Sequence, residues 1–481
     1  METLMDYLED GIGKVINVDT KKITIEVSEE ETLNRLKIND MTIMSGNNAD
    51  EKLIGIITKV TKKRIDFDKN ENEQEEEWNC SANICNVTLV GSFYIKLGIK
   101  KRNIFKRSIN TYPEINSEVF LAEGEALSII MNSLDDIDSP VTEKLMIGKY
   151  ASNREVQAIL DGNKFFQRHA CIVGSTGSGK SYTIANILEK TAKLPYANII
   201  VYDLHGEYTQ LSYAEQIKIS DENGGLHIPI WFFNYEEIHS LFIESSEGTS
   251  TNQRAAVVDY ILKSKKEYIE KNMKELSSDV VTADTPVPFS AHRLKEYLEK
   301  EDIREDETGD FYKSGDNKGQ PKTKKGQYNG KLTNLIMRLQ TKVDDKKYGF
   351  IFNEDETQDE SYLNEFTRKI MGVDSSKKIK VIDLSEVPTD MLAIVIGIVT
   401  RLVYDVQFWM SPQNNQTRHP LAFVCDEAHI YMSNDMSSMR MAEKKSLEIF
   451  EKISKEGRKY GIALLIVSQR PAELNTTIIS Q

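Results

Sequence analysis

Hydrophobic and polar residues alternate over much of the first 130 positions. Segments 14–18, 22–27, 53–60 and 86–95 place apolar or β-branched residues at alternate positions, with polar, turn-forming stretches between them. The acidic stretch 66–77, DFDKNENEQEEE, has too few apolar residues to pack and is expected to be a solvent-exposed loop. Short strands joined by such loops predict a small β-barrel, which we assign to residues 1–135.

A different pattern starts near Leu145, where short apolar runs alternate with helical segments. The runs lie at 170–174, 197–203, 378–384, 421–426 and 461–468. Fully apolar strands that alternate with helices are typical of a parallel sheet covered on both faces. The sequence therefore predicts an α/β core made of residues 136–235 and 372–481.

The 236–371 segment between the two halves of this core has a sequence pattern typical of helices. Residues 253–276 and 292–300 are predicted to be helical, and so is 330–343, which carries apolar side chains at helical spacing. Residues 301–330 are rich in Gly, Lys, Asp, Asn and Gln, and they predict a mobile loop. We interpret the whole segment as a helical insertion.

Composition narrows the class of protein. Of 481 residues, 28% are charged and 40% hydrophobic, which excludes a wholly disordered or collagen-like chain. The formal charge of -14 argues against a general nucleic-acid coat protein. Local basic segments remain at 100–107 and 313–331, as candidate DNA contacts or simply solvated faces.

Cysteine usage and the longest apolar run predict a reduced protein of the cytoplasm. Cys80 and Cys85 lack a second Cys/His pair, so a zinc site is not expected, and Cys171 and Cys425 lie in apolar runs that predict burial. The first residues do not form a signal-peptide pattern. The longest apolar run, 391–400, is too short to cross a membrane, which needs about 20 residues.

The strongest chemical motif is GSTGSGKS at 174–181, between an apolar strand and a helical segment. This is the G-x-x-x-x-G-K-[ST] pattern of a P-loop, and the flanking strand and helix favour that reading over a flexible Gly/Ser turn. The glycines let backbone N–H groups surround phosphates, Lys180 reaches the β and γ phosphates, and the Ser181 hydroxyl binds Mg²⁺. The residues assigned to ATP are Gly174, Ser175, Thr176, Gly177, Ser178, Gly179, Lys180, Ser181, Tyr182 and Asp203.

Polar residues at the ends of three other strands complete the predicted site. Asp426 is expected to hold Mg²⁺, and Glu427 to orient or deprotonate the attacking water. Gln469 is placed to sense the γ-phosphate or the water, unless it is an exposed strand end. Asp203 and Glu207 either polarise water or Mg²⁺ or serve as turn and capping residues.

Two arginines near these motifs are candidates for stabilising the charge that develops on the γ-phosphate. Arg168 precedes the P-loop strand and Arg458 precedes the strand of Gln469. A guanidinium from the same chain or a neighbouring one could serve. Each could instead be a surface ion pair.

The segments RHACIVGSTGSGKS, YDLHGEY, CDEAH and EGRKYGIALLIVSQRPAELNTTIISQ together resemble the HerA branch of the HerA/FtsK ATPases, often described as DUF87-type. The resemblance covers the chain from about Leu145 onward, and members continue beyond the position of Gln481. It implies a RecA-like P-loop NTPase core, ATP and Mg²⁺ as cofactors, and a hexameric ring that translocates double-stranded DNA. It also implies nucleotide-site roles for Lys180, Ser181, Asp426, Glu427 and Gln469, with at least one of the two arginines acting across a subunit interface.

Members of this family work with partners. The resemblance implies an effector such as a NurA-like nuclease or a sirtuin-like NADase, in DNA-end processing or anti-phage defence. A second hypothesis is a nucleotide-regulated ring scaffold that assembles and activates an effector enzyme. A third, a conjugation-type coupling ATPase, is disfavoured by the predicted lack of a membrane span.

Overall fold

The computed structural model describes residues 4–8, 10–46, 51–64, 81–96, 102–133, 144–150, 154, 156–222, 224–244, 247–312, 319–410 and 419–481. The acidic stretch 66–77 and Cys80 lie outside these residues, as do parts of both basic segments. The chain divides into two compact units, 1–162 and 163–481. This division falls later than the boundary after residue 135 that the sequence suggests.

The first unit is a closed barrel. Its strands are β1 (Gly13–Val18), β2 (Ile23–Val27), β3 (Met41–Ser45), β4 (Glu51–Arg64), β5 (Ser81–Lys96), β6 (Arg102–Lys106) and β7 (Glu118–Leu121). They pair in the order β2-β1-β7-β3-β4-β5-β6, and an additional β2–β5 pairing closes a ring of six strands, with β6 paired to β5 beside it. Ile23, Ile25 and Val27 face the interior, where Cys85 is also buried, because alternate residues of a strand point to the same side. The predicted β-barrel is confirmed.

Shorter elements complete the first unit. Helices α1 (Glu30–Arg35) and α2 (Gly124–Ser133) belong to it, as does a separate antiparallel pair, β8 (Lys144–Lys149) and β9 (Gln157–Asp161). The second unit begins at residue 163, within the short helix α3 (Gly162–Gln167). The sequence analysis predicted neither strand of this pair.

The second unit contains a parallel sheet, as predicted. Its strands are β10 (Ala170–Val173), β11 (Ile199–Asp203), β12 (Ala214–Lys218), β15 (Ile379–Asp383), β16 (Leu421–Cys425) and β17 (Ile462–Ser468). The order is β10-β17-β16-β11-β15-β12, with every neighbouring pair parallel. All carboxyl ends therefore lie at one edge, which brings together the residues that follow β10, β16 and β17. Cys171, on β10, is exposed, so its predicted burial is wrong.

Both faces of this sheet are buried along its central strands β11, β16 and β17. Val201, Val424 and Leu465 point to one face, where Ile184 and Leu188 of α4 (Lys180–Thr191) pack on them. The alternate residues point to the other face and join a larger cluster with α11 (Thr389–Trp409) and α12 (Met441–Glu456). This arrangement confirms the predicted α/β class and explains why the central strands are apolar at every position.

The predicted helical insertion is present between β12 and β15. It contains α5 (Tyr235–Phe242), α6 (Ser250–Asn272), α7 (Ala291–Ile303), α8 (Thr333–Asp344), α9 (Gly349–Phe352) and α10 (Ser361–Met371). Its apolar residues belong to the same cluster as the α11 face of the sheet, so the insertion shares its core with the sheet.

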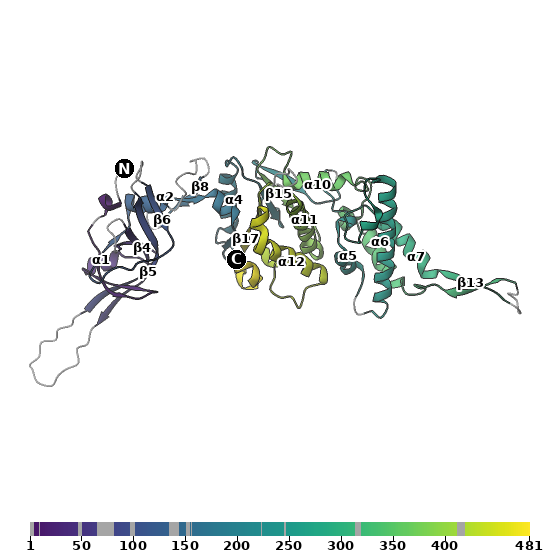
Figure 1. Cartoon of the computed structure of the whole chain (residues 1–481), viewed down its shortest axis with the longest axis horizontal. Helices are drawn as coiled ribbons and strands as arrows, with labels where there is room; N and C mark the ends of the chain where they lie inside the picture. The colour runs from purple at the N-terminus through teal and green to yellow at the C-terminus, as the bar shows by residue number, and fades with distance from the viewer. Residues whose placement is uncertain are drawn as a thin grey trace, which may run out of the picture. The chain divides into compact units, whose positions relative to one another are not determined.

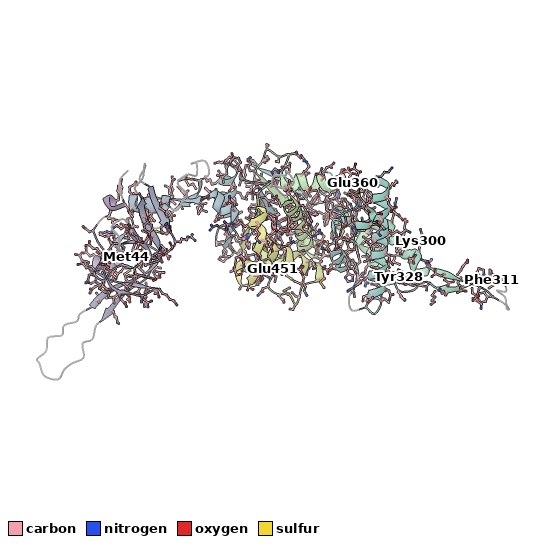
Figure 2. All side chains as sticks on the ribbon, viewed as in Figure 1. Met44, Lys300, Phe311, Tyr328, Glu360 and Glu451 are labelled. Atoms are coloured by element: carbon pink, nitrogen blue, oxygen red, sulfur yellow. The ribbon has the colours of Figure 1, made fainter. Side chains whose placement is uncertain are left out.

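The mobile loop predicted at 301–330 is replaced by regular structure over its described residues. Helix α7 continues to Ile303, and β13 (Glu305–Phe311) pairs with β14 (Pro321–Lys325) as an antiparallel hairpin. The hairpin extends away from α6 and α7, with Phe311 far from Tyr328 at its base (Figures 1 and 2). The prediction failed because backbone pairing, with opposite charges such as Glu305 and Lys325 placed across from each other, can hold a polar hairpin without apolar burial.

Helix α11 corrects the expectation that no segment is long enough to cross a membrane. It has 21 residues and its apolar window has a mean hydropathy of 1.7, which satisfies the length and composition of a membrane span. In the structure 72% of that window is buried inside the unit. The helix is apolar because it packs between the sheet and the insertion.

Candidate active site

The P-loop connects β10 to α4, as the motif predicts. Gly177 and Gly179 have φ values of 77° and 90°, a left-handed conformation that glycine adopts without strain. At Gly174 an added Cβ would lie 2.4 Å from Ser178 Oγ, so the loop is too tight for a side chain there. The loop ends at the N-terminus of α4, where helix N–H groups and the helix dipole favour a bound phosphate.

Four predicted residues meet at the carboxyl edge of the sheet. Lys180 Nζ lies 3.1 Å from Glu427 Oε1, and both side chains are about nine-tenths buried, at 10% and 11% exposed. Gln469 Nε2 donates to the same oxygen at 3.2 Å, and Thr176 Oγ1 donates to Gln469 Oε1 at 2.7 Å. A chain of contacts therefore joins the P-loop, the end of β17 and the acidic pair after β16.

Glu427 has an unusual backbone. Its φ of 44° and ψ of 41° are left-handed, which few residues other than glycine adopt. Its N–H donates to Asp426 Oδ1 at 2.9 Å, and a 3-10 turn, Ala428–Ile430, follows at once. Strain of this kind is concentrated at functional sites, and here it turns the Glu427 carboxylate toward Lys180.

Asp426 is held from a second side by a residue to which the sequence analysis gave no role. Tyr208 is buried and its hydroxyl donates to Asp426 Oδ2 at 3.0 Å. Burial raises the pKa of the Asp426 carboxyl, while the Glu427 amide, the Tyr208 hydroxyl and the charge of Lys180 oppose that rise. Tyr208 belongs to the YDLHGEY segment, but nothing in the sequence shows that its ring reaches β16.

Asp203 builds the turn that carries Tyr208. Its carboxylate accepts backbone N–H groups of His205, Glu207 and Tyr208 at 3.3, 3.0 and 2.8 Å. Burial raises the pKa of Asp203, and these three hydrogen bonds oppose that rise. The geometry favours the turn-capping alternative for Asp203, and it connects Asp203 to the site through Tyr208.

The residues present fit a magnesium ion. Ser181, the second residue of α4, offers a hydroxyl and Asp426 offers a carboxylate, which are the hard oxygen donors that Mg²⁺ prefers. The two hydrogen bonds to Asp426 use one lone pair on each oxygen and leave the others available. Tyr182 is 85% exposed directly beside this position, so its ring is free to contact a bound nucleotide.

The two arginines are not at this edge of the sheet. Arg168 comes two residues before β10 begins and Arg458 four residues before β17 begins, and both are exposed. The seven residues of β17 span about 23 Å at about 3.3 Å per residue. Within one chain, Arg458 is therefore separated from Gln469 by the length of a strand, and neither arginine completes the site of its own chain.

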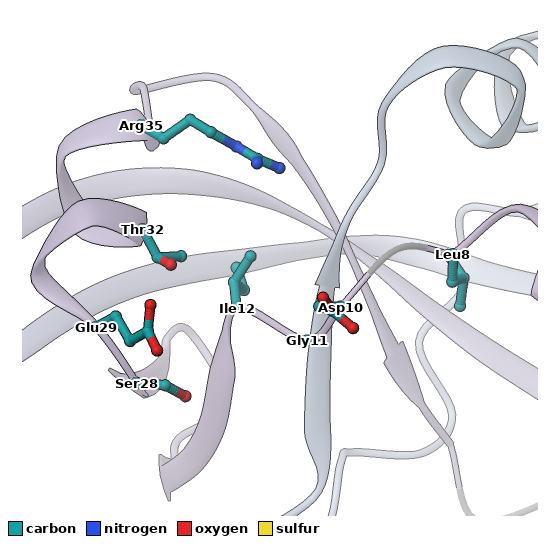
Figure 3. Close-up of a pocket in the computed structure, with 8 residues that line it drawn as sticks. All are labelled: Leu8, Asp10, Gly11, Ile12, Ser28, Glu29, Thr32 and Arg35. Carbon is teal, nitrogen blue, oxygen red and sulfur yellow. The ribbon is translucent and has the colours of Figure 1, made fainter.

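A cavity of about 710 Å³ lies in the first unit, remote in sequence from every P-loop motif (Figure 3). Arg35 and Thr32 reach it from α1, and Asp10 and Ile12 from the entry to β1. Arg35 is paired with Glu123 at 3.1 Å.

The described part of the 100–107 segment includes Lys106, which lies over the Tyr94 ring at 5.5 Å.

Comparison with known proteins identifies similar sequences over most of the chain. The family described as "Helicase HerA, central domain" matches residues 145–403. A probable helicase of Methanocaldococcus jannaschii is 26% identical over 70% of this chain and 56% of its own length. The DNA double-strand break repair helicases HerA of Sulfolobus acidocaldarius and Saccharolobus solfataricus are 24% and 23% identical, over 77% and 98% of this chain and 62% and 80% of theirs. The chain thus spans less than two thirds of the first two relatives.

Two solved structures match over most of this chain with low TM-scores. VirB4 of Thermoanaerobacter pseudethanolicus is 15% identical, with a TM-score of 0.39 over 71% of this chain and 81% of that one. The plasmid coupling protein TrwB, bound to a non-hydrolysable ATP analogue, is 12% identical, with a TM-score of 0.41 over 75% and 76% of the two chains.

Proposed function

Because the chain belongs to the family of the HerA helicase central domain, we propose that it is an ATP-hydrolysing motor that translocates double-stranded DNA. The observation that carries the proposal is the meeting of Lys180, Glu427 and Gln469 at the carboxyl edge of the sheet, beside the P-loop. A P-loop by itself indicates nucleotide binding but not hydrolysis. A buried carboxylate next to its lysine adds a base for hydrolysis.

Each residue has a defined task in this proposal. Lys180 leaves Glu427 for the β and γ phosphates, and the freed carboxylate takes a proton from the attacking water. Gln469 stays hydrogen-bonded to Glu427 and to Thr176, so it links the base to the P-loop. Asp426 and Ser181 would hold Mg²⁺, which neutralises phosphate charge.

The placement of the arginines supports a ring of identical chains. Arg168 and Arg458 lie at the amino edge of the sheet, opposite the nucleotide site. In a homo-oligomer, a hexamer by resemblance, such an edge can face the nucleotide site of the next subunit. We assign the arginines to charge stabilisation in trans, and the ring pore to the DNA duplex.

An effector protein is part of the proposal. The curated relatives include proteins named as double-strand break repair helicases, which is consistent with a nuclease partner in DNA-end processing in the cytoplasm. A NADase partner in anti-phage defence remains the other candidate. Glu427→Gln separates a motor from a scaffold: if a variant that binds ATP without hydrolysing it still activates the partner fully, the ring is a scaffold.

The direct test is ATP turnover of the full chain with and without a DNA duplex. We expect duplex DNA to increase turnover and Lys180→Ala to abolish it. Lys193→Ala is a matched control because Lys193 is 69% exposed and lies just after α4, paired only with Glu189 at 3.6 Å among the described residues. Absence of turnover by the wild-type chain, with DNA and under assembly conditions, would exclude the motor.

A further inference from the structure

His429 lies at the centre of the site, although the proposed mechanism gives it no task. It is the second residue of the 3-10 turn Ala428–Ile430, which begins directly after Glu427, and its side chain is 10% exposed. Its Nδ1 is 3.3 Å from Glu427 Oε2 and 3.3 Å from Ser468 Oγ. The ring therefore joins the acidic pair to the last residue of β17.

The two oxygens of Glu427 have different surroundings. Oε1 is contacted by Lys180 Nζ and by Gln469 Nε2. Oε2 is buried and has no hydrogen-bond donor aligned with it among the described residues. A buried carboxylate oxygen without a donor is costly, so the nearest group that can carry a proton is favoured to supply one. That group is Nδ1 of His429.

Ser468 limits the alternatives for the imidazole proton. Its Oγ already accepts the N–H of Arg470 at 3.0 Å and keeps one hydroxyl proton to donate. If Ser468 donates to Nδ1, two lone pairs face each other between Nδ1 and Oε2. If Nδ1 carries the proton, a small ring rotation directs it to Oε2 and no buried lone pairs oppose each other.

The contact gains importance once ATP binds, because phosphates then draw Lys180 away from Oε1. Glu427 is left with Gln469 on one oxygen and His429 beside the other. Its left-handed backbone is a strained conformation that persists only where the surrounding contacts hold it. We propose that His429 is a positioning residue that donates from Nδ1 to Glu427 Oε2 and directs Oε1 at the attacking water. The proposal rests on the ATPase function proposed above.

The test compares three substitutions by steady-state ATP turnover and by binding of a fluorescent ATP analogue. We expect His429→Ala to lower kcat at least tenfold and leave the nucleotide Kd within about twofold. We expect His429→Asn to restore most of kcat, since its amide N–H can occupy the position of Nδ1. His429→Gln, which reaches only the position of Nε2, should not. His292→Ala, an exposed histidine of α7, is the control.

The outcomes are distinguishable. Equal kcat in wild type and His429→Ala, at equal melting temperature, overturns the inference while leaving the ATPase intact. Equal loss in the Ala and Asn variants also overturns it, because the ring would then only fill space. A weakened Kd with unchanged kcat assigns His429 to binding and overturns it too. A wild-type chain that does not hydrolyse ATP refutes the proposed function itself.

Discussion

The substitution Glu427→Gln tests the role of the Lys180–Glu427 ion pair in the site without nucleotide. Lys180 and Glu427 are 3.1 Å apart and nearly buried. Two unit charges at that distance attract by about 5 kcal/mol at an effective dielectric constant of about 20. Desolvation of both groups offsets much of this, which leaves a net contribution of about 1–2 kcal/mol. ATP must break the pair when it takes Lys180.

Glu427→Gln removes that competition and also removes the base. We expect the variant to bind ATP about 5–30-fold more tightly, which is the factor that 1–2 kcal/mol corresponds to. We expect turnover to fall by about 10²–10⁴-fold, the usual contribution of general-base catalysis. Unfolding without nucleotide should occur at a lower temperature, because Lys180 is left buried without its counter-charge.

The assay pairs titration of a fluorescent ATP analogue with phosphate release under saturating ATP. Glu189→Gln, on the exposed side of α4, is the control for loss of a carboxylate. Turnover within about fivefold of wild type would show that Glu427 is not the base. Weaker ATP binding would show that the Lys180–Glu427 pair does not compete with the phosphates.

Three further predictions concern other parts of the structure. Tyr208→Phe removes the hydrogen bond to buried Asp426 and should lower the free energy of unfolding by about 1.5–3 kcal/mol. It should also raise the Mg²⁺ concentration needed for turnover. Unchanged unfolding and an unchanged Mg²⁺ dependence would refute this. Arg458→Ala and Lys180→Ala chains, each inactive alone, should regain activity when mixed if Arg458 acts in trans, whereas Lys455→Ala should be active alone. Burial lowers the pKa of Lys265 to about 7, so the folded state binds fewer protons than the unfolded state above pH 7, and stability from this group rises with pH. Relative to Lys265→Met, urea unfolding should show wild-type stability increasing by about 2 kcal/mol between pH 7 and 9.

The pattern of amino acids was sufficient to predict those elements whose structure depends on their own residues and not on distant contacts. The apolar strands β10, β11, β15, β16 and β17 and the P-loop between β10 and α4 were predicted because burial and phosphate binding impose a residue type at each position. The polar elements were not predicted, because their residue types are not imposed by burial or by phosphate binding. Strand β12, AEQIK, and the β13–β14 hairpin are held by pairing partners rather than by their own composition.

The contacts of the site depended on tertiary structure. Residues 180, 427 and 469 are far apart in the chain, and only the strand order β10-β17-β16 places them side by side. The side-chain contacts of the folded chain show that Tyr208 reaches Asp426 and that His429 lies against Glu427, and the strand direction places Arg458 at the opposite edge. A motif specifies which chemical groups are present, because each group belongs to one residue. Distances between groups arise from how strands pair and which way they run, and that is a property of the whole fold.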